Sequence, residues 1–558
     1  MSEDKRREYY KRIRIIVGNH FQKVEVLAFN APFVSKALEL LVSCGLLSIS
    51  FFNSHKTTNF FSEYLGCDSG DDASRIIAMN FKKHNLFENR WKFKFGGEVG
   101  GKPALVIGGG SRSQCLQAYG AAKLAGVPAV IGMILKNGIS LISVVYPDER
   151  FPFEEIDFET VDIDLNSYFS WVDLSNQMAN ACRAILLEGT NWQRDDVCSL
   201  LNQHKTTIVS EHPSWPWSSK YIDLEDPDEK EWLVQVIDST KLERAKVDLS
   251  GKTVLIVGLG SLGSVIAKHY QIAGANVVGI DGKKVSLYNP IRQIYSTAMI
   301  GVQKAYALPQ ILAADSGGKF SFLEDHREIT YIGDQIFTGI NTLIPDSKIG
   351  SNMFSEILDE NSPDLIIFAT ANSAEFRMAK LARERNIAHI QCSCYPRARW
   401  YRNIVVNGSE GPCYGCLHGQ LYTGVSPTLT EEQIAAYSLG DKSIDAEPAT
   451  MIDTARCADS VARIGLHLMA SRKNFPDWLS FMLEKELTYL IGGNSAEFRP
   501  EGDGWTNGVE TPGGAAWYGV KNVMGYDYER NKTCIYCGKV YDVKFLRTSQ
   551  KKQGGEIE

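Results

Sequence analysis

Four cysteines occur as two Cys-x-x-Cys pairs, Cys413/Cys416 and Cys534/Cys537. A tight turn lets both sulfurs of such a pair face one ion, and four thiolates complete the tetrahedral coordination of a structural zinc site. Because the pairs lie far apart in the chain, a shared ion would tie the end of the chain to an earlier segment. The spacing predicts a structural Zn²⁺ site, and a redox role for either pair is the alternative.

A single cysteine, Cys457, lies where an irregular stretch is expected to give way to a helix. A thiol near a helix N-terminus and beside Arg456 should have a lowered pKa and more thiolate. The pattern therefore predicts a nucleophile, with a buried structural thiol as the alternative. The other cysteines lie mostly in apolar patterns and are interpreted as core thiols: Cys44, Cys67, Cys115, Cys182, Cys198, Cys392 and Cys394.

Residues 254–281 read VLIVGLGSLGSVIAKHYQIAGANVVGID, with glycines at Gly258, Gly260 and Gly263. In a strand–turn–helix unit the first glycine permits the tight turn, the second lets the backbone approach phosphate, and the third lets the helix pack on the strand. Asp281 ends the second strand at the spacing of a carboxylate that binds ribose hydroxyls. The pattern predicts a nucleotide site, and His269 behind the turn is interpreted as a helix-surface residue.

Two short motifs follow Asp281 and bear on which nucleotide is bound. NPIRQ contains Asn289, Arg292 and Gln293, and GVQKA contains Lys304. Arginine offers a planar fork of donors for phosphate, and lysine offers a compact charge. These cations favour a triphosphate over a dinucleotide, and no hydride-handling His/Asp pair of a dehydrogenase is evident.

The elements around these motifs alternate strand and helix, which predicts an α/β fold with parallel sheets. The rhythm recurs in the same order, more faintly, in the N-terminal part of the chain, where NAPFVS occupies the place of GLGSLG. We therefore expect two related Rossmann-like halves, the first degenerate and the second nucleotide-binding. Two unrelated folds are the alternative. The expected division is 1–245 (the first half), 246–540 (the second half) and a disordered tail at 541–558.

Composition excludes several classes of protein. A chain of 558 residues with a net charge of −7 lacks the basic character of a nucleic-acid-binding protein. Its longest uncharged run near the N-terminus, 41–54, is too short to cross a bilayer. No secretion signal precedes the twelve cysteines, so reduced thiols and a cytoplasmic location are expected.

The combined motifs resemble the ubiquitin-activating and sulfur-carrier adenylyltransferase superfamily, which has the ThiF/MoeB-like fold. The Asn-Pro-x-Arg-Gln variant is most similar to autophagy-type activating enzymes and some bacterial relatives. The resemblance covers about 250–540 and extends to the first half as an inactive adenylation half. It implies ATP and Mg²⁺ as cofactors, a zinc clamp made by the four paired cysteines, and Cys457 as the thioester-forming nucleophile.

The same resemblance points to two further positions. Arg12, in YYKRIRIIVG, would reach from the first half to ATP bound by the second, although a solvated basic helix face is the alternative. Asn372, placed by Arg377, occupies the position of the magnesium-binding aspartate of the family. An asparagine oxygen can coordinate Mg²⁺ but brings no charge. Adenylation could therefore be slow, use a carboxylate from elsewhere, or be absent.

The resemblance implies adenylation of the C-terminal carboxylate of a ubiquitin-like protein ending in glycine. Thioester formation on Cys457 and transfer to a conjugating enzyme would follow. The alternatives are a sulfur-carrier or peptide adenylyltransferase that stops at the adenylate, and a pseudoenzyme scaffold. A homodimer or a pseudo-dimer within one chain is expected, with no nucleic-acid or membrane partner. Bacterial ubiquitin-like conjugation, including antiviral defence, is a setting suggested by analogy alone.

Overall fold

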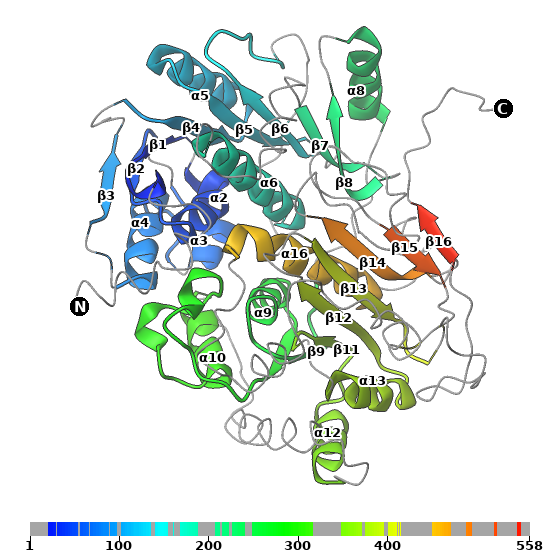
Figure 1. Ribbon diagram of the computed structural model, residues 1–558. Helices are drawn as coiled ribbons and strands as arrows, with labels where there is room; N and C mark the ends of the chain where they lie inside the picture. The colour runs from blue at the N-terminus through cyan, green and yellow to red at the C-terminus, as the bar shows by residue number, and fades with distance from the viewer. Residues whose placement is uncertain are drawn as a thin grey trace, which may run out of the picture.

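The structure is a computed structural model of the chain (Figure 1). It describes residues 20–29, 31–53, 56–65, 67–86, 88, 90–96, 102–135, 140–153, 160, 168–187, 207–212, 215–222, 226–239, 248–315, 348–370, 374–394, 400–409, 411, 413, 449–469, 487–493, 518–521 and 544–547.

The first sheet has eight strands in the order β3-β2-β1-β4-β5-β6-β7-β8. The strands from β3 to β5 are parallel, and β6, β7 and β8 continue the sheet as antiparallel strands. The bounds are β1 Glu25–Ala28, β2 Ser48–Phe51, β3 Lys92–Phe95, β4 Leu105–Gly109, β5 Ala129–Ile134, β6 Ser140–Val145, β7 Thr207–His212 and β8 Trp215–Ile222.

The second sheet also has eight strands, in the order β10-β9-β11-β12-β13-β14-β15-β16. Its strands are parallel from β10 to β12 and antiparallel from β13 to β16. The bounds are β9 Thr253–Val257, β10 Asn276–Ile280, β11 Leu365–Phe368, β12 Ala388–Cys394, β13 Trp400–Val406, β14 Leu487–Gly493, β15 Tyr518–Lys521 and β16 Lys544–Arg547.

The two sheets share one connectivity. β1 lies between β2 and β4, as β9 lies between β10 and β11, and an antiparallel extension follows the parallel part of each sheet. The first sheet has the additional parallel edge strand β3, and the second has the additional antiparallel edge strand β16. A helix links the equivalent strands in each sheet: α2 and α9, then α5 and α13, then α6 and α16. The predicted α/β class with parallel-rich sheets is therefore confirmed. A common origin of the two halves remains a prediction.

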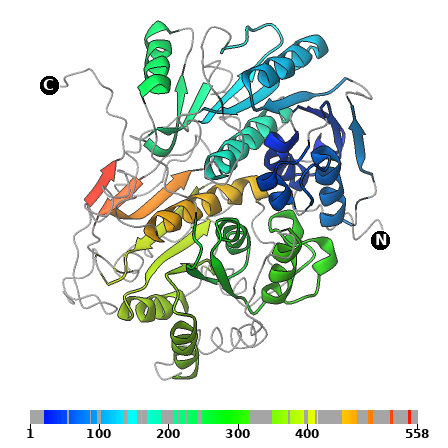
Figure 2. The ribbon, with the colours of Figure 1, turned by 180° about the vertical axis from the view of Figure 1, so that it is seen from behind.

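Four helices form the contact between the two sheets: α2 (Ala31–Ser43), α6 (Tyr168–Leu186), α9 (Gly263–Ile272) and α16 (Met451–Met469). In Figures 1 and 2, α6 and α16 lie side by side between the two sheets. Helix α2 packs on α6, and α9 packs on α16. Their apolar residues belong to one buried core cluster that spans both halves.

The remaining helices flank the sheets or lie at the ends of strands. Among the described residues they are η1 His20–Gln22, α3 Asn59–Leu65, α4 Ala73–His84, α5 Arg112–Ala125, α8 Pro227–Ser239, η2 Asn289–Ile291, η3 Thr297–Met299, α10 Lys304–Asp315, α12 Lys348–Asn361 and α13 Ala374–Glu384. No helix in this described part of the chain is long and apolar enough to cross a bilayer.

Part of the C-terminal tail 541–558, which is predicted to be disordered, forms a strand: β16 lies within it and pairs antiparallel with β15. The rest of the tail lies outside the described residues. The register joins Tyr518 to Arg547 and Lys521 to Lys544. An antiparallel edge strand gains ladder hydrogen bonds from its neighbour, which composition alone does not reveal.

Candidate nucleotide site

The three glycines of the turn are each explained by their surroundings. Gly258 has a φ of +95°, and a Cβ there would lie 2.8 Å from Cγ2 of Thr370. A Cβ on Gly263 would overlap the carbonyl oxygen of Gly258, so this glycine allows α9 to start against β9. Around Gly260 nothing lies within 4 Å of a Cβ position. The turn is thus closed by Gly258 and Gly263 and open at Gly260, as a phosphate-binding turn requires.

Both backbone groups of Leu259, inside the turn, are held by side chains from other elements. The Leu259 amide donates to Asp281 Oδ2 at 2.8 Å, and Tyr295 Oη donates to the Leu259 carbonyl at 2.9 Å. Asp281 Oδ1 also accepts from the Lys283 amide at 2.8 Å. Asp281 therefore orders the turn, and its role in binding a ribose stays a prediction.

A group of charges gathers beside the turn. Lys304, the first residue of α10, is 7% exposed, and its Nζ lies 4.0 Å from Asp281 Oδ2. Burial lowers the pKa of Lys304, Asp281 counteracts this, and Lys283 and Arg292 lower the pKa further. Arg292 is therefore near enough to act electrostatically on Lys304. Three cations, Lys304, Lys283 and Arg292, beside one carboxylate leave an excess of positive charge that suits phosphate.

The NPIRQ motif forms a short 3₁₀ turn, η2. Asn289 caps the preceding segment by accepting from the Ser286 amide at 2.8 Å. The amides of Arg292 and Gln293 both donate to the Asn289 carbonyl, at 3.0 and 2.9 Å. The side-chain oxygen of Gln293 is buried without a hydrogen-bond partner in the described part of the chain. Such a group is an acceptor for a ligand or a water.

The end of β11 lies directly against the turn. The Gly258 environment includes Ala369 and Thr370, and the amide and hydroxyl of Thr370 donate to Glu375 Oε1 at 2.8 and 2.6 Å. Glu375, 2% exposed, thereby ties the end of β11 to the start of α13. Asn372 and Arg12 lie outside the described residues. Their predicted roles are untested.

The predicted environment of Cys457 is wrong. Helix α16 begins at Met451, so Cys457 lies about two turns into it, beyond the first turn to which a helix dipole effect is confined. The thiol is 0% exposed and donates to Asn403 Oδ1 at 3.7 Å. Burial raises its pKa well above the usual range, and a hydrogen bond with Cys394 raises it further. In this conformation Cys457 is a buried thiol, not an activated thiolate.

Of the four cysteines predicted to bind zinc, the structure describes one. Cys413 is buried, whereas Cys416, Cys534 and Cys537 lie outside the described residues. The zinc clamp therefore stays a prediction. The expectation of core thiols is confirmed at four positions, which are buried: Cys44, Cys115, Cys182 and Cys392.

His269 is also not where the sequence suggested. It is 1% exposed rather than on a helix surface, and it joins the two halves. Its Nδ1 lies 2.8 Å from Tyr168 Oη, and its Nε2 lies 2.5 Å from Asp459 Oδ1. Burial raises the pKa of Tyr168, so its hydroxyl stays protonated. More of the surface of α9 is buried than the spacing of its apolar residues indicates, because the helix contacts both β9 and α6.

Sequence reasoning missed residues that hold the site together. Tyr295 is 0% exposed and supports the turn, and His84 and Thr297 link η2 and η3 to α4. Only proximity to NPIRQ could have drawn attention to Tyr295 and Thr297. No sequence pattern near His84 predicts its contact with Pro290.

A glycine turn that opens a helix, a carboxylate after the next strand and a buried lysine beside it make this a candidate nucleotide site in an α/β protein. Residues 235–464 match the ThiF family. The match spans the glycine turn, Asp281, NPIRQ, Lys304 and most of α16, which supports the ThiF/MoeB-type superfamily and an adenylyltransferase that uses ATP and Mg²⁺.

None of the curated proteins compared with the chain matches it. Among solved structures, 159 chains match. One is the crystal structure of SeMet PaaA, with 18% identity, a TM-score of 0.31, and coverage of 45% of this chain and 72% of that chain.

Proposed function

We propose that the protein adenylates the C-terminal carboxylate of a ubiquitin-like or sulfur-carrier protein at the expense of ATP. One observation carries the proposal: within the range that matches the ThiF family, Asp281 joins the glycine turn to the buried cation Lys304. An open turn at Gly260 beside three cations, Lys304, Lys283 and Arg292, supports binding of a triphosphate.

In this reaction a carboxylate oxygen attacks the α-phosphorus, and the bond from that phosphorus to the pyrophosphate oxygen breaks. Arg292 and Lys304 would neutralise the charge that develops on the phosphates. Asn372 would offer an oxygen to Mg²⁺, and Arg12 would add a cation from the first half. Asp281 would orient the ribose while it holds the Leu259 amide.

The finer proposal is a ubiquitin-like modifier activating enzyme that passes the acyl group to Cys457 and then to a conjugating enzyme. The first half would be its inactive adenylation half, so the chain acts as an internal pseudo-dimer. Because Cys457 is buried, thioester formation would require α16 to move away from β12 and β13. An enzyme that stops at the adenylate would need no such movement.

The first experiment is ATP–pyrophosphate exchange with the purified full-length chain and a ubiquitin-like protein ending in Gly-Gly. Exchange that depends on the added protein and is lost in Lys304→Met would support adenylation. ATP binding without exchange would reject adenylation, and no ATP binding would favour a scaffold. Exposed Lys83→Ala is a matched lysine control.

The thioester step is tested separately, on a non-reducing gel. An ATP-dependent, reductant-sensitive adduct that is present in wild type and absent in Cys457→Ala would support the activating-enzyme proposal. Exchange without any adduct in both proteins would favour the adenylate-only enzyme. An adduct that persists in Cys457→Ala would transfer the role to another thiol, and Cys394→Ala would test the nearest one.

A further inference from the structure

Residues 289–297, which carry NPIRQ, lie between the glycine turn and the first half of the chain. On one side, Tyr295 donates to the Leu259 carbonyl inside the turn. On the other side, Pro290 and Thr297 contact the end of α4, which belongs to the first half. The segment is therefore held from both halves.

Three hydrogen bonds among the described residues join the segment to the end of α4. His84, the last residue of α4, places Nε2 3.0 Å from the Pro290 carbonyl oxygen. A carbonyl can only accept, so Nε2 must carry the hydrogen. The Thr297 hydroxyl accepts from the Leu86 amide at 2.8 Å and donates to the His84 carbonyl at 3.3 Å. Thr297, 4% exposed, thus uses its hydroxyl as both donor and acceptor.

The Pro290 carbonyl is available for this contact because of the local turn. In η2 the amides of Arg292 and Gln293 both donate to Asn289, not to Pro290. His84 therefore binds the backbone midway between Asn289 and Arg292. A shift of Pro290 would carry both neighbouring side chains with it.

Helix α4 is a firm support for the contact. Asp72 caps its N-terminus by accepting from the Arg75 amide at 3.2 Å, and the Asn85 amide closes the other end on the Phe81 carbonyl. Ile77 and Phe81 anchor the helix in the core. His84 is thus presented from a capped and buried element rather than from a loop.

We propose that His84 and Thr297 are positioning residues through which the first half sets the geometry of Asn289–Gln293, and thereby the ATP affinity of the second half. This inference rests on the proposed binding of ATP. Fixing the segment before the nucleotide arrives lowers the ordering cost of binding. Neither side chain needs to touch the nucleotide for this effect.

The test compares His84→Ala, His84→Gln and Thr297→Val with the neighbouring exposed control Lys83→Ala. In glutamine the amide nitrogen can take the place of Nε2 as donor, whereas alanine has no donor. ATP binding is measured by isothermal titration calorimetry, and KM and kcat for ATP by pyrophosphate exchange. Hydrogen exchange of residues 289–297 is measured without ATP, together with the melting temperature.

We expect His84→Ala and Thr297→Val to weaken ATP binding about 3- to 10-fold, the range of one lost hydrogen bond. The loss should appear in KM more than in kcat, with faster hydrogen exchange at 289–297. His84→Gln should restore most of the affinity. Equal effects of alanine and glutamine, or unchanged ATP affinity in His84→Ala and Thr297→Val, would overturn the inference.

Failure of the proposed function gives a different result. If wild type binds no ATP, the ATP-binding function and this inference both fall. If wild type binds ATP and His84→Ala changes hydrogen exchange at 289–297 without changing affinity, only the inference falls. A lower melting temperature with unchanged affinity would show a purely structural contact and would also overturn it.

Discussion

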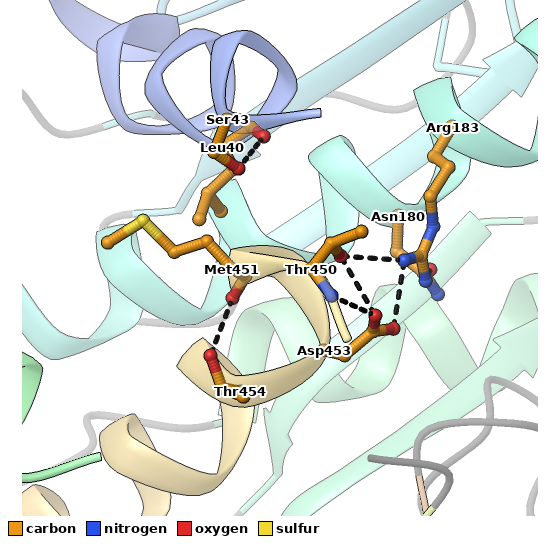
Figure 3. Close-up of polar contacts among 8 residues, drawn as sticks. All are labelled: Leu40, Ser43, Asn180, Arg183, Thr450, Met451, Asp453 and Thr454. Atoms are coloured by element: carbon orange, nitrogen blue, oxygen red, sulfur yellow. Dashed lines mark hydrogen bonds and ion pairs between the residues drawn. The ribbon is translucent and has the colours of Figure 1, made fainter. Parts of the chain in front are cut away.

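The guanidinium of Arg183 donates from Nη1 to Asp453 Oδ1 at 2.8 Å, and both side chains are almost completely buried (Figure 3). Arg183 belongs to α6 and Asp453 to α16, so the ion pair crosses between the halves. Asp453 also accepts from the amide and hydroxyl of Thr450, both at 2.8 Å, and thereby caps α16. Asn180 accepts from Nη2 of Arg183 at 2.7 Å. One charge pair therefore joins the halves and starts the helix that carries Cys457.

Removing one member of this pair should destabilise the protein strongly. Asp453→Ala leaves the Arg183 guanidinium buried without its counter-ion, a change that costs about 3 to 5 kcal/mol. Thermal unfolding should show a clear drop in melting temperature for Asp453→Ala and for Arg183→Ala. The exposed pair Lys380/Glu384 is the control, where Glu384→Ala should change stability by about 0.5 kcal/mol or less.

The double variant distinguishes the ion pair from general damage to the core. If the charges act on each other, Arg183→Ala should cost much less when Asp453 is already alanine. Fully additive losses in the two single variants would contradict the coupling.

Substituting alanine at Gly263 and at Gly260 should affect different properties of the protein. Gly263→Ala would place a methyl group against the Gly258 carbonyl, so it should lower the melting temperature and disrupt the turn. Gly260→Ala meets no protein atom within 4 Å, so it should leave the melting temperature unchanged but weaken ATP binding about tenfold or more. An unchanged ATP affinity in folded Gly260→Ala would argue against phosphate lying at this turn.

The free energy of unfolding should decrease as the pH is lowered, and His389 should account for part of this decrease. Burial lowers the pKa of this histidine to about 4, and its Nδ1 lies 3.1 Å from the Ile387 carbonyl. Between pH ~6.5 and ~4 the unfolded chain takes up a proton that the native ring does not, so the free energy of unfolding decreases as the pH falls. In His389→Asn the loss between pH ~6.5 and ~5 should be smaller by about 1 to 2 kcal/mol. The check is urea unfolding at both pH values; equal losses in the two proteins would contradict this prediction.

Cys394 should react with alkylating agents before Cys457. Cys394 is half-buried at the end of β12, whereas Cys457 is fully buried and burial raises its pKa. Brief treatment of the native protein with iodoacetamide, followed by mass spectrometry, should label Cys394 and spare Cys457. In urea both should be labelled. Equal rates in the native state would show that α16 opens readily and would favour Cys457 as an acyl acceptor.

Short-range patterns accounted for the parts of the site that lie close in sequence. Gly258, Gly260 and Gly263 could be predicted because each glycine meets a local demand of the strand–turn–helix unit. Asp281 could be predicted because it ends the next strand. The sequence also contains a signal for the start of α16: Thr450 and Asp453 have the spacing of a capping box.

Contacts between distant segments could not be predicted in this way. His84 and Pro290 meet only because the packing of α4 brings the two halves together. The burial of His269 has the same cause, since its partners Tyr168 and Asp459 come from α6 and α16. A single sequence specifies which residues are apolar, but not which distant polar groups will be enclosed together.

The seam between α6 and α16 bears on how the chain can be divided. Besides the Arg183–Asp453 pair, Arg463 donates to the Phe169 carbonyl at 3.0 Å, and Tyr168 contacts His269. Either half expressed alone would present this apolar seam to water, along with charged groups that had lost their counterparts. The halves are therefore suited to complementation by co-expression, each acting as the folding partner of the other, and poorly suited to study as isolated fragments.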